Sequence, residues 1–271
     1  MFLAPIISPT MTFERRPIGE KGHVLVDTAL EAEGFLAAFT ERTGGESGAP
    51  YDSLNLSFFV GDDEDVVRAN RARVTAALGI DTFGTAEQVH GARLVKVGEK
   101  RSAAGFAGPD GRIPRADVMS TTSAGVALAV LTADCVPVVA ASAGQGLLVS
   151  AHAGWRGIAG GIVAVIAQQF ADPRAVRVAI GPSIGIDHYE VGDDVALAVA
   201  SGTQSGVVSE RRDGRTHVDL AGTIRAELRA LGIRKVEGTG LCTACEPKRF
   251  FSYRVDEVTG RQAAVAVKLR R

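Results

Sequence analysis

Short apolar runs of strand length recur along the chain, and most are bounded by glycine, proline or charged residues. Runs of this length that are rich in β-branched residues are typical of buried strands. We therefore predict strands at residues 34–40, 54–59, 93–97, 116–120, 126–131, 136–141, 147–151, 176–180 and 262–269. Between residues 86 and 151 the predicted strands follow one another without an intervening helix, which disfavours a Rossmann alternation and favours an α+β fold with mixed or antiparallel sheets.

Four segments have the helical period instead. In the clearest of them, residues 63–78, Asp62 and Asp63 can cap the amino end and Gly79 can end the helix. Further helices are predicted at residues 155–170, 193–201 and 220–231. A stretch containing Gly, Ser and Pro at residues 101–114 is predicted to be a long surface loop.

Three apolar runs end in residues that can bind a metal or act as a nucleophile, namely His90, Cys135 and His152. If the runs are neighbouring strands, the three side chains meet at strand ends, where loops can gather around one pocket. Two imidazoles and one thiolate form either an open zinc site or a Cys-His nucleophilic pair with an additional histidine. The sequence leaves both interpretations open, because it contains no short zinc-protease, deaminase or Walker motif.

The segment that follows His152 is rich in glycine and precedes a predicted helix. Glycine lets the backbone approach a ligand, and the amino end of a helix directs its N–H groups toward an anion. Arg156 lies in this segment and favours phosphate or another anion. The alternative is a tight turn in which the glycines serve packing and the arginine is solvated.

The composition is that of a soluble globular protein, with 271 residues, 46% hydrophobic and 23% charged. A net charge of −1 argues against broad binding to nucleic acid or to an anionic membrane. No apolar stretch reaches about 18 residues, so no spanning helix is expected. Residues 1–7 lack a basic region and are interrupted by proline, so they make a poor signal peptide and a cytoplasmic protein is expected.

The chain has three cysteines, which are too few for a disulfide scaffold. Cys242 and Cys245 have the C-x-x-C spacing of redox and zinc-ribbon motifs, but the second pair of a ribbon is missing. Glu246 and Pro247 follow, which is not typical of a redox helix. We therefore interpret Cys245 as incidental.

Several motifs occur in an order that resembles a known family. They are Gln88-Val89-His90-Gly91, Thr132-Ala133-Asp134-Cys135-Val136-Pro137, Ala151-His152-Ala153-Gly154-Trp155-Arg156-Gly157, Ile180-Gly181-Pro182-Ser183-Ile184-Gly185 and Phe250-Phe251-Ser252-Tyr253-Arg254, with Arg42-Thr43-Gly44-Gly45, Ser53-Leu54-Asn55-Leu56, Gly61-Asp62 and Asn70-Arg71. These motifs span about residues 39 to 269 and resemble the YfiH family. Its members are also described as laccase-domain or polyphenol-oxidase-like proteins and are associated with purine nucleoside phosphorylase activity.

The resemblance implies an α+β fold, a single domain of layered mixed β-sheets with flanking helices, similar to the fold grouped with the cysteine deamidases. It places this YfiH-like catalytic domain at residues 35–271, after an N-terminal segment, partly strand, at residues 1–34. It also implies that zinc is bound by His90, Cys135 and His152, which are then the catalytic residues as well as the metal ligands. Copper is the alternative metal.

Family members are reported to phosphorolyse adenosine, inosine, guanosine and methylthioadenosine and to deaminate adenosine, so a purine nucleoside and phosphate are the expected partners. The expected substrate-binding residues are Arg42, Asn55, Arg156 and Arg254. Two departures from the family pattern are Val255, where a second arginine is usual, and Glu46, where the family commonly has valine. The oligomeric state stays open.

Three other functions compete with this one. Cys135 and His152 would suit a thiol hydrolase or amidase that edits a peptidoglycan precursor, an activity also linked to bacterial relatives. A copper-dependent polyphenol oxidase follows from the older family name, but a mononuclear site together with a trinuclear cluster needs more ligands than the five histidines present. A non-enzymatic binding protein is the last alternative.

Overall fold

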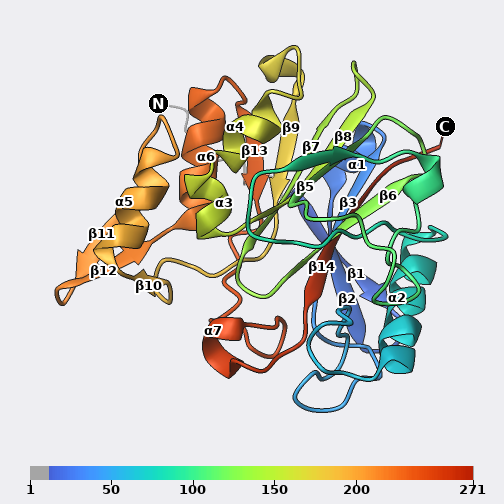
Figure 1. The fold of residues 1–271 in the computed structure, drawn as a ribbon. Coiled ribbons are helices and arrows are strands. Elements are labelled where there is room, and N and C mark those ends of the chain that lie inside the picture. The colour runs from blue at the N-terminus through green and yellow to red at the C-terminus, as the bar shows by residue number, and fades with distance from the viewer. Residues whose placement is uncertain (1–11, 271) are drawn as a thin grey trace, which may run out of the picture.

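Two large β-sheets pack face to face, and helices cover their outer faces (Figure 1). The computed structural model describes residues 12–270, so the predicted absence of a signal peptide at residues 1–7 concerns residues outside the described part. The helices are α1 (Thr28–Ala32), α2 (Glu64–Leu78), α3 (Trp155–Ala159), α4 (Ile162–Ala167), α5 (Asp193–Ser201), α6 (Leu220–Ala230) and α7 (Tyr253–Asp256), with short 3₁₀ turns at Glu99–Arg101 and Pro173–Ala175. The strands are β1 (Phe13–Ile18), β2 (Gly22–Asp27), β3 (Phe35–Thr40), β4 (Leu94–Lys96), β5 (Val118–Thr121), β6 (Ala127–Thr132), β7 (Val136–Ser142), β8 (Leu147–Ala153), β9 (Arg177–Ile180), β10 (Glu190–Val191), β11 (Ser209–Arg212), β12 (Arg215–Val218), β13 (Lys235–Gly238) and β14 (Gln262–Lys268).

The first sheet has the order β1-β2-β3-β14-β6 and is antiparallel throughout. The second sheet has the order β13-β9-β7-β8-β5-β4, in which the β13–β9 and β4–β5 pairs are parallel and the others antiparallel. A small sheet of β10, β12 and β11 lies to one side. These mixed and antiparallel sheets confirm the predicted α+β class.

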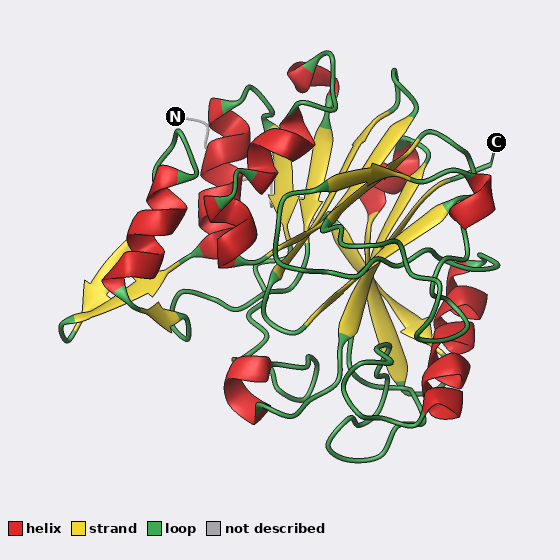
Figure 2. Cartoon of the chain, in the orientation of Figure 1, coloured by secondary structure: helices red, strands yellow, loops and turns green. Residues whose placement is uncertain are grey.

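Apolar side chains form three layers that hold the sheets and helices together. Between the two large sheets, Phe39 of the first sheet packs in one cluster with Val139 and Leu148 of the second. The other face of the first sheet packs against α2 through Val74, and the other face of the second sheet packs against α3–α6. Figure 2 shows the result, with the strands inside and most helices on the outside. The layered arrangement expected from the resemblance is therefore confirmed.

Helix α2 shows how closely local sequence signals can define an element. Asp63 is its N-cap and accepts hydrogen bonds from the backbone N–H groups of Asp65 and Val66. Gly79 is its C-cap in the left-handed region, with φ +65°, where glycine carries no Cβ penalty. The predicted helix at residues 63–78 is confirmed, as are the helices predicted at 193–201 and 220–231 to within one residue.

Two predicted elements are wrong. Residues 54–59 form a loop, although apolar and polar residues alternate from Leu54 to Phe58 as in a strand, and all five of these residues are buried. Their backbone N–H groups donate to the carbonyls of Arg42 and Arg261, at 2.7 and 3.0 Å, instead of to a strand ladder. The helix predicted at residues 155–170 is divided into α3 and α4, because the chain turns at Gly160 and at Gly161, whose φ is +79°.

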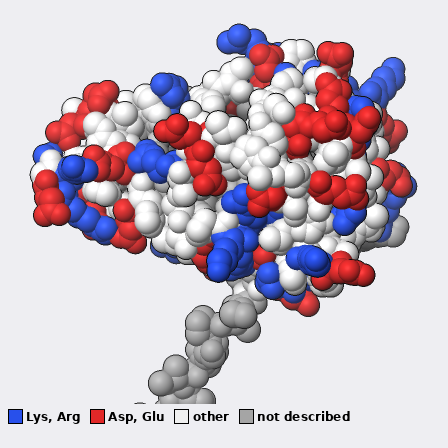
Figure 3. Space-filling view, turned by 90° about the horizontal axis from the view of Figure 1, so that it is seen from below, with Lys and Arg blue, Asp and Glu red and all other residues white. Residues whose placement is uncertain are grey.

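The N-terminal segment contributes β1, β2 and α1, and β2 pairs with β3 across the proposed boundary at residues 34 and 35. That boundary stays a prediction. No helix within residues 12–270 has the length and apolar character needed to cross a membrane. Figure 3 shows basic and acidic side chains interspersed over one face of the molecule.

Candidate metal centre

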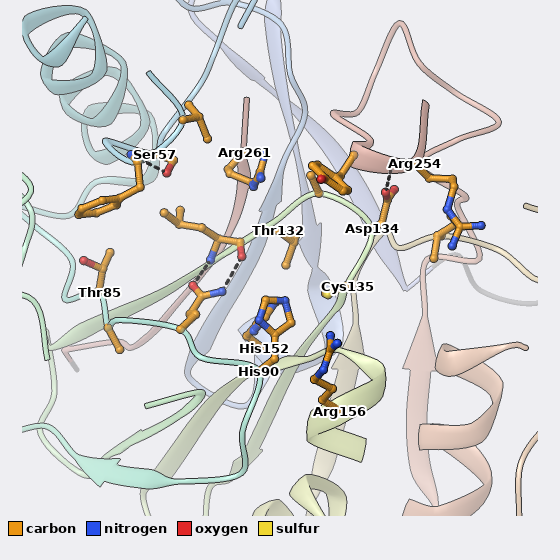
Figure 4. Close-up of a pocket in the computed structure, with 18 of the residues that line it drawn as sticks. Ser57, Thr85, His90, Thr132, Asp134, Cys135, His152, Arg156, Arg254 and Arg261 are labelled. Atoms are coloured by element: carbon orange, nitrogen blue, oxygen red, sulfur yellow. Dashed lines mark hydrogen bonds between the residues drawn. The ribbon is translucent and has the colours of Figure 1, made fainter. Parts of the chain in front are cut away.

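His90, Cys135 and His152 are brought together, with one ligand atom of each lying within 4.8 Å of the others. We call these three residues the inner cluster. His90 lies in the loop before β4, Cys135 in the turn between β6 and β7, and His152 in β8 (Figure 4). The imidazole centroids of the two histidines are 4.9 Å apart. The proposed convergence on one pocket is thus observed, although β6 and β8 belong to different sheets instead of being neighbours in one.

The buried carboxylate of Asp117 positions both histidines. Its oxygens accept the backbone N–H groups of Val89, His90 and Gly91 at 3.1, 3.0 and 2.8 Å, which fixes the loop that carries His90. One of these oxygens also lies 2.9 Å from Nδ1 of His152, so the Nε2 edge of that ring is left for the cluster. A carboxylate behind a histidine is the usual outer-shell arrangement of a metal ligand.

Two further features hold the inner cluster together: a hydrogen-bonded glutamine and a glycine beside the ligands. The side-chain amide of Gln88 pairs with the backbone of Leu131, at 2.7 and 2.8 Å, and so joins the His90 loop to the end of β6 just before Cys135. At Gly154, a Cβ atom would lie 2.9 Å from Sγ of Cys135 and 3.0 Å from Cδ2 of His90. Any larger residue at position 154 would therefore push the ligands apart.

Burial and charge shift the pKa values of the cluster in opposite directions. Burial alone would raise the pKa of the Cys135 thiol, but the neighbouring His152 and His90 imidazoles lower it to about 6. Burial alone would lower the pKa of His152, but the Cys135 sulfur and the Asp117 carboxylate raise it to about 9. Both shifts favour the charged forms, a thiolate at Cys135 beside an imidazolium at His152.

The inner cluster opens into a cavity of about 550 Å³, a size in the range of small-molecule sites. Its lining is cationic, because five arginines but only one carboxylate, that of Asp134, contribute to it. These arginines are Arg71, Arg112, Arg156, Arg254 and Arg261. Aromatic rings of Phe59, Trp155, Tyr189 and Tyr253 complete much of the wall.

Asp134 ties the far wall of the cavity to the turn that carries Cys135. One oxygen accepts the hydroxyl of Thr243 at 2.6 Å and the other accepts the backbone N–H of Arg254 at 2.7 Å. The Arg254 guanidinium in turn donates to the carbonyls of His188 and Glu190, at 3.2 and 3.1 Å. These bonds hold C-terminal residues against the metal centre.

The structure divides the four expected substrate-binding residues into two pairs. Arg156 and Arg254 line the cavity, and the guanidinium of Arg156 lies beside the inner cluster in Figure 4. Arg42 is absent from the lining and bonds to the carbonyls of Asp52 and Pro247 at 2.8 and 2.9 Å. Asn55 is buried outside the lining and ties Ser57, Asp62 and the backbone of Arg261 together.

Sequence reasoning missed Asp117 and Arg261. Asp117 was detectable as a carboxylate at the start of a buried strand, where a charged side chain needs a partner. Arg261 precedes β14, lines the cavity and donates to the carbonyls of Thr259 and Gly260. Its sequence position gives no such signal, since arginines before a strand are common.

Residues 36–268 match the profile of a family described as multi-copper polyphenol oxidoreductase laccase. Purine nucleoside phosphorylase ORF3 of Streptomyces griseus is 40% identical over 232 residues, which cover 83% of this chain and 91% of that protein. Purine nucleoside phosphorylase YfiH of Escherichia coli is 34% identical over 237 residues, covering 86% and 94%. This chain belongs to the YfiH family. The crystal structure of YlmD from Geobacillus stearothermophilus, at 34% identity, has a TM-score of 0.89 and covers 96% of this chain and 99% of that one.

The side chains of the inner cluster fit a bound metal ion. Two imidazole nitrogens and a thiolate suit zinc or copper, three protein ligands leave a fourth position toward the cavity, and Asp117 supplies the outer shell. Among residues 12–270, the only other group of three such ligands with atoms this close is His188, Cys242 and Cys245. A trinuclear cluster of histidines has no counterpart in this part of the chain.

Proposed function

We propose that this YfiH protein is a zinc-dependent purine nucleoside phosphorylase that acts on adenosine, inosine, guanosine and methylthioadenosine and also deaminates adenosine. The observation that carries the proposal is the cavity itself, which joins a three-ligand metal centre to a group of arginines. The names of the relatives from Streptomyces griseus and Escherichia coli support the purine nucleoside phosphorylase activity in this proposal.

His90, Cys135 and His152 would hold the zinc ion, with the Asp117 carboxylate keeping the His152 ring in its orientation. Zinc in this position supplies a Lewis acid that polarises a substrate atom or a water molecule. The three ligands are part of the cavity lining, so a substrate in the cavity would lie close to the ion.

The arginines of the lining suit the second substrate, phosphate. Arg156 and Arg254 are exposed side chains of the cavity lining, and the half-buried Arg261 adds a third guanidinium. Guanidinium groups bind phosphate through two parallel hydrogen bonds and stay charged at neutral pH. We infer that these three side chains orient phosphate for attack on the anomeric carbon of the ribose.

The remaining walls suit a nucleoside. Tyr189, Tyr253 and Phe59 offer flat apolar faces of the kind on which a purine stacks. In phosphorolysis, positive charge develops on the sugar and negative charge on the departing base, so fixed charges around both give more stabilisation than mobile water. The Asp134 carboxylate is the anionic group of the lining available to the sugar, and the arginines are available to phosphate and base.

Hypoxanthine release from inosine tests the proposal. Zinc-loaded protein should release hypoxanthine only when phosphate is present, with ribose 1-phosphate as the second product, and chelation should abolish the release. Adenosine without phosphate should give inosine by deamination. Release of hypoxanthine without phosphate by metal-loaded protein would contradict phosphorolysis.

Zinc rather than copper is part of the proposal. Metal analysis of protein purified without added metal should find zinc bound to the inner cluster. Copper in its place, together with oxidation of phenols, would support the polyphenol oxidase instead.

One observation favours a second candidate, a thiol hydrolase or amidase. Asp117, His152 and Cys135 lie in the order of a catalytic triad, and the pKa of Cys135 is lowered to about 6. This candidate predicts a covalent adduct between Cys135 and its substrate and fast alkylation in the presence of zinc. Protection of Cys135 by one equivalent of zinc would exclude it.

A further inference from the structure

A second group of metal-binding side chains lies apart from the inner cluster. One ligand atom each of His188, Cys242 and Cys245 lies within 4.8 Å of the others. We call these three residues the outer cluster. His188 and Cys245 are exposed and Cys242 is half-buried, so the group is open to solvent.

The sheet explains why these residues meet. Strands β9 and β13 are paired in parallel, so the segments that follow them leave the same edge of the second sheet (Figure 1). Ser183, after β9, forms a bridge with Cys242, after β13, and its carbonyl accepts the N–H of Thr243 at 3.1 Å. His188 is thereby placed beside a C-x-x-C pair that is more than fifty residues away in sequence.

The backbone around Cys242 is arranged for a thiolate. The N–H of Gly185 donates to Sγ of Cys242 at 3.1 Å, and a Cβ at position 185 would lie 3.2 Å from that sulfur. The N–H of Glu246 donates to the carbonyl of Cys242 at 3.2 Å, which closes a turn and brings the Cys245 sulfur near the Cys242 sulfur. Hydrogen bonds to a ligating sulfur and a two-residue spacing are both common in structural zinc sites.

We propose that His188, Cys242 and Cys245 bind a second zinc ion. Two thiolates and one imidazole are soft and borderline ligands that match zinc and leave its fourth position to water or a small anion. The nearest carboxylates are engaged elsewhere, since Asp187 bonds to Arg212 at 2.5 Å and Glu246 to Arg249 at 2.6 Å. This site is independent of the activity proposed for the inner cluster.

The position of the outer cluster indicates what the ion would do. Tyr189, next to His188, lines the cavity, and Thr243, between the two cysteines, donates to Asp134. Arg254 donates to the carbonyl of His188. An ion at the outer cluster would therefore cross-link two loops that form one wall of the cavity, and its role would be structural.

Zinc stoichiometry tests the site on the full-length protein. Cys245→Ser and Cys242→Ser/Cys245→Ser should each contain one zinc fewer per chain than the wild type. Lys248→Ser, an exposed substitution three residues along, should match the wild type. Unchanged zinc content in a folded Cys242→Ser/Cys245→Ser protein would overturn the proposal, whatever the inner cluster binds.

Two measurements keep the test decisive if the cysteine variants do not fold. In the wild type, zinc should protect Cys242 and Cys245 from alkylation, and peptide mapping should find them as thiols. In Cys135→Ser these two are the only cysteines left, so cobalt should still produce sulfur-to-metal charge-transfer absorption. Alkylation that zinc does not slow, or a Cys242–Cys245 disulfide in freshly purified protein, would contradict a metal site.

Discussion

The inner and outer clusters contain the same kinds of ligand in different surroundings. In the inner cluster, His152 is buried, bonded to Asp117 and close to a single thiol, whereas the outer cluster has two thiols beside an exposed histidine. Imidazoles lower the pKa of Cys135 to about 6. In the outer cluster a hydrogen bond in which the Cys245 thiol donates to the Cys242 sulfur, followed by burial, raises the pKa of Cys245 to about 11.

This difference teaches that the neighbours of a cysteine, more than its exposure, set its chemistry. A thiol next to an imidazolium is a ready nucleophile or metal ligand near neutral pH. A thiol next to another thiol keeps its proton until a metal displaces it. We therefore assign reactivity to the inner cluster and a structural role to the outer one.

Removing an inner ligand should give the largest effect. His152→Ala should lower kcat/KM for inosine phosphorolysis on the order of 10³-fold, because Lewis-acid stabilisation is worth several kcal/mol. Zinc content should fall by one equivalent. His23→Ala is the matched control, since His23 belongs to neither cluster and should keep both activity and zinc. Equal losses of activity and zinc in His152→Ala and His23→Ala would contradict the assignment of His152 as a ligand of the catalytic metal.

Alkylation of zinc-free protein should separate the two thiols directly. At pH 7 about 10⁴-fold more of Cys135 than of Cys245 is thiolate, and the weaker nucleophilicity of a low-pKa thiolate reduces the rate ratio to about 30–100-fold. The rate at Cys135 should rise as the pH rises through about 6, and that at Cys245 only through about 11. Peptide mapping after timed iodoacetamide treatment measures both alkylation rates. Similar rates for Cys135 and Cys245 at pH 7 would contradict the proposed difference in reactivity between the two clusters.

Asp117→Asn should weaken zinc binding by about 10- to 100-fold, the usual cost of losing an outer-shell partner. The substitution leaves the inner ligands in place but removes the negative charge that holds the His152 proton. Competition with a chelator measures the affinity, and Asp172→Asn, at an exposed ion pair, is the control. Unchanged affinity in Asp117→Asn would show that the carboxylate only serves the fold.

The smallest effect is expected for the phosphate-binding arginines. Arg156→Ala should raise KM for phosphate about 10-fold, because it removes one charged hydrogen-bond donor from the cavity. Arg42→Ala should leave that KM unchanged and lower the melting temperature, because Arg42 bonds to backbone carbonyls outside the lining. Steady-state kinetics at varied phosphate and thermal unfolding separate the two arginines.

The sequence predicts well those features whose signals are local. The α2 caps Asp63 and Gly79 follow from short-range hydrogen bonding, and the apolar runs before Cys135 and His152 give β6 and β8. Which sheet each strand joins depends on long-range pairing that periodicity does not report. For that reason the sequence alone leaves open whether β6 and β8 are neighbours, and they lie in different sheets.

The outer cluster is a clearer example of a feature that depends on long-range strand pairing and therefore cannot be predicted from local sequence. The C-x-x-C spacing of Cys242 and Cys245 is visible in the sequence, but the second pair of a zinc ribbon is missing, and Cys245 is therefore interpreted as incidental. The missing ligand, His188, is supplied by the parallel pairing of β9 and β13. The strand predicted at residues 54–59 is wrong for a related reason. Backbone N–H groups of this segment donate to the carbonyls of Arg42 and Arg261 and to the side chain of Asn55, and the segment forms a loop.

Zinc titration of activity is the most direct test of the inner cluster as the catalytic metal centre. It uses chelated Cys242→Ser/Cys245→Ser protein, in which only the inner cluster can take up zinc. Phosphate-dependent hypoxanthine release from inosine should rise linearly with added zinc and reach its plateau at one equivalent per chain. Full release before any zinc is added, or none after one equivalent is bound, would contradict a catalytic zinc at His90, Cys135 and His152.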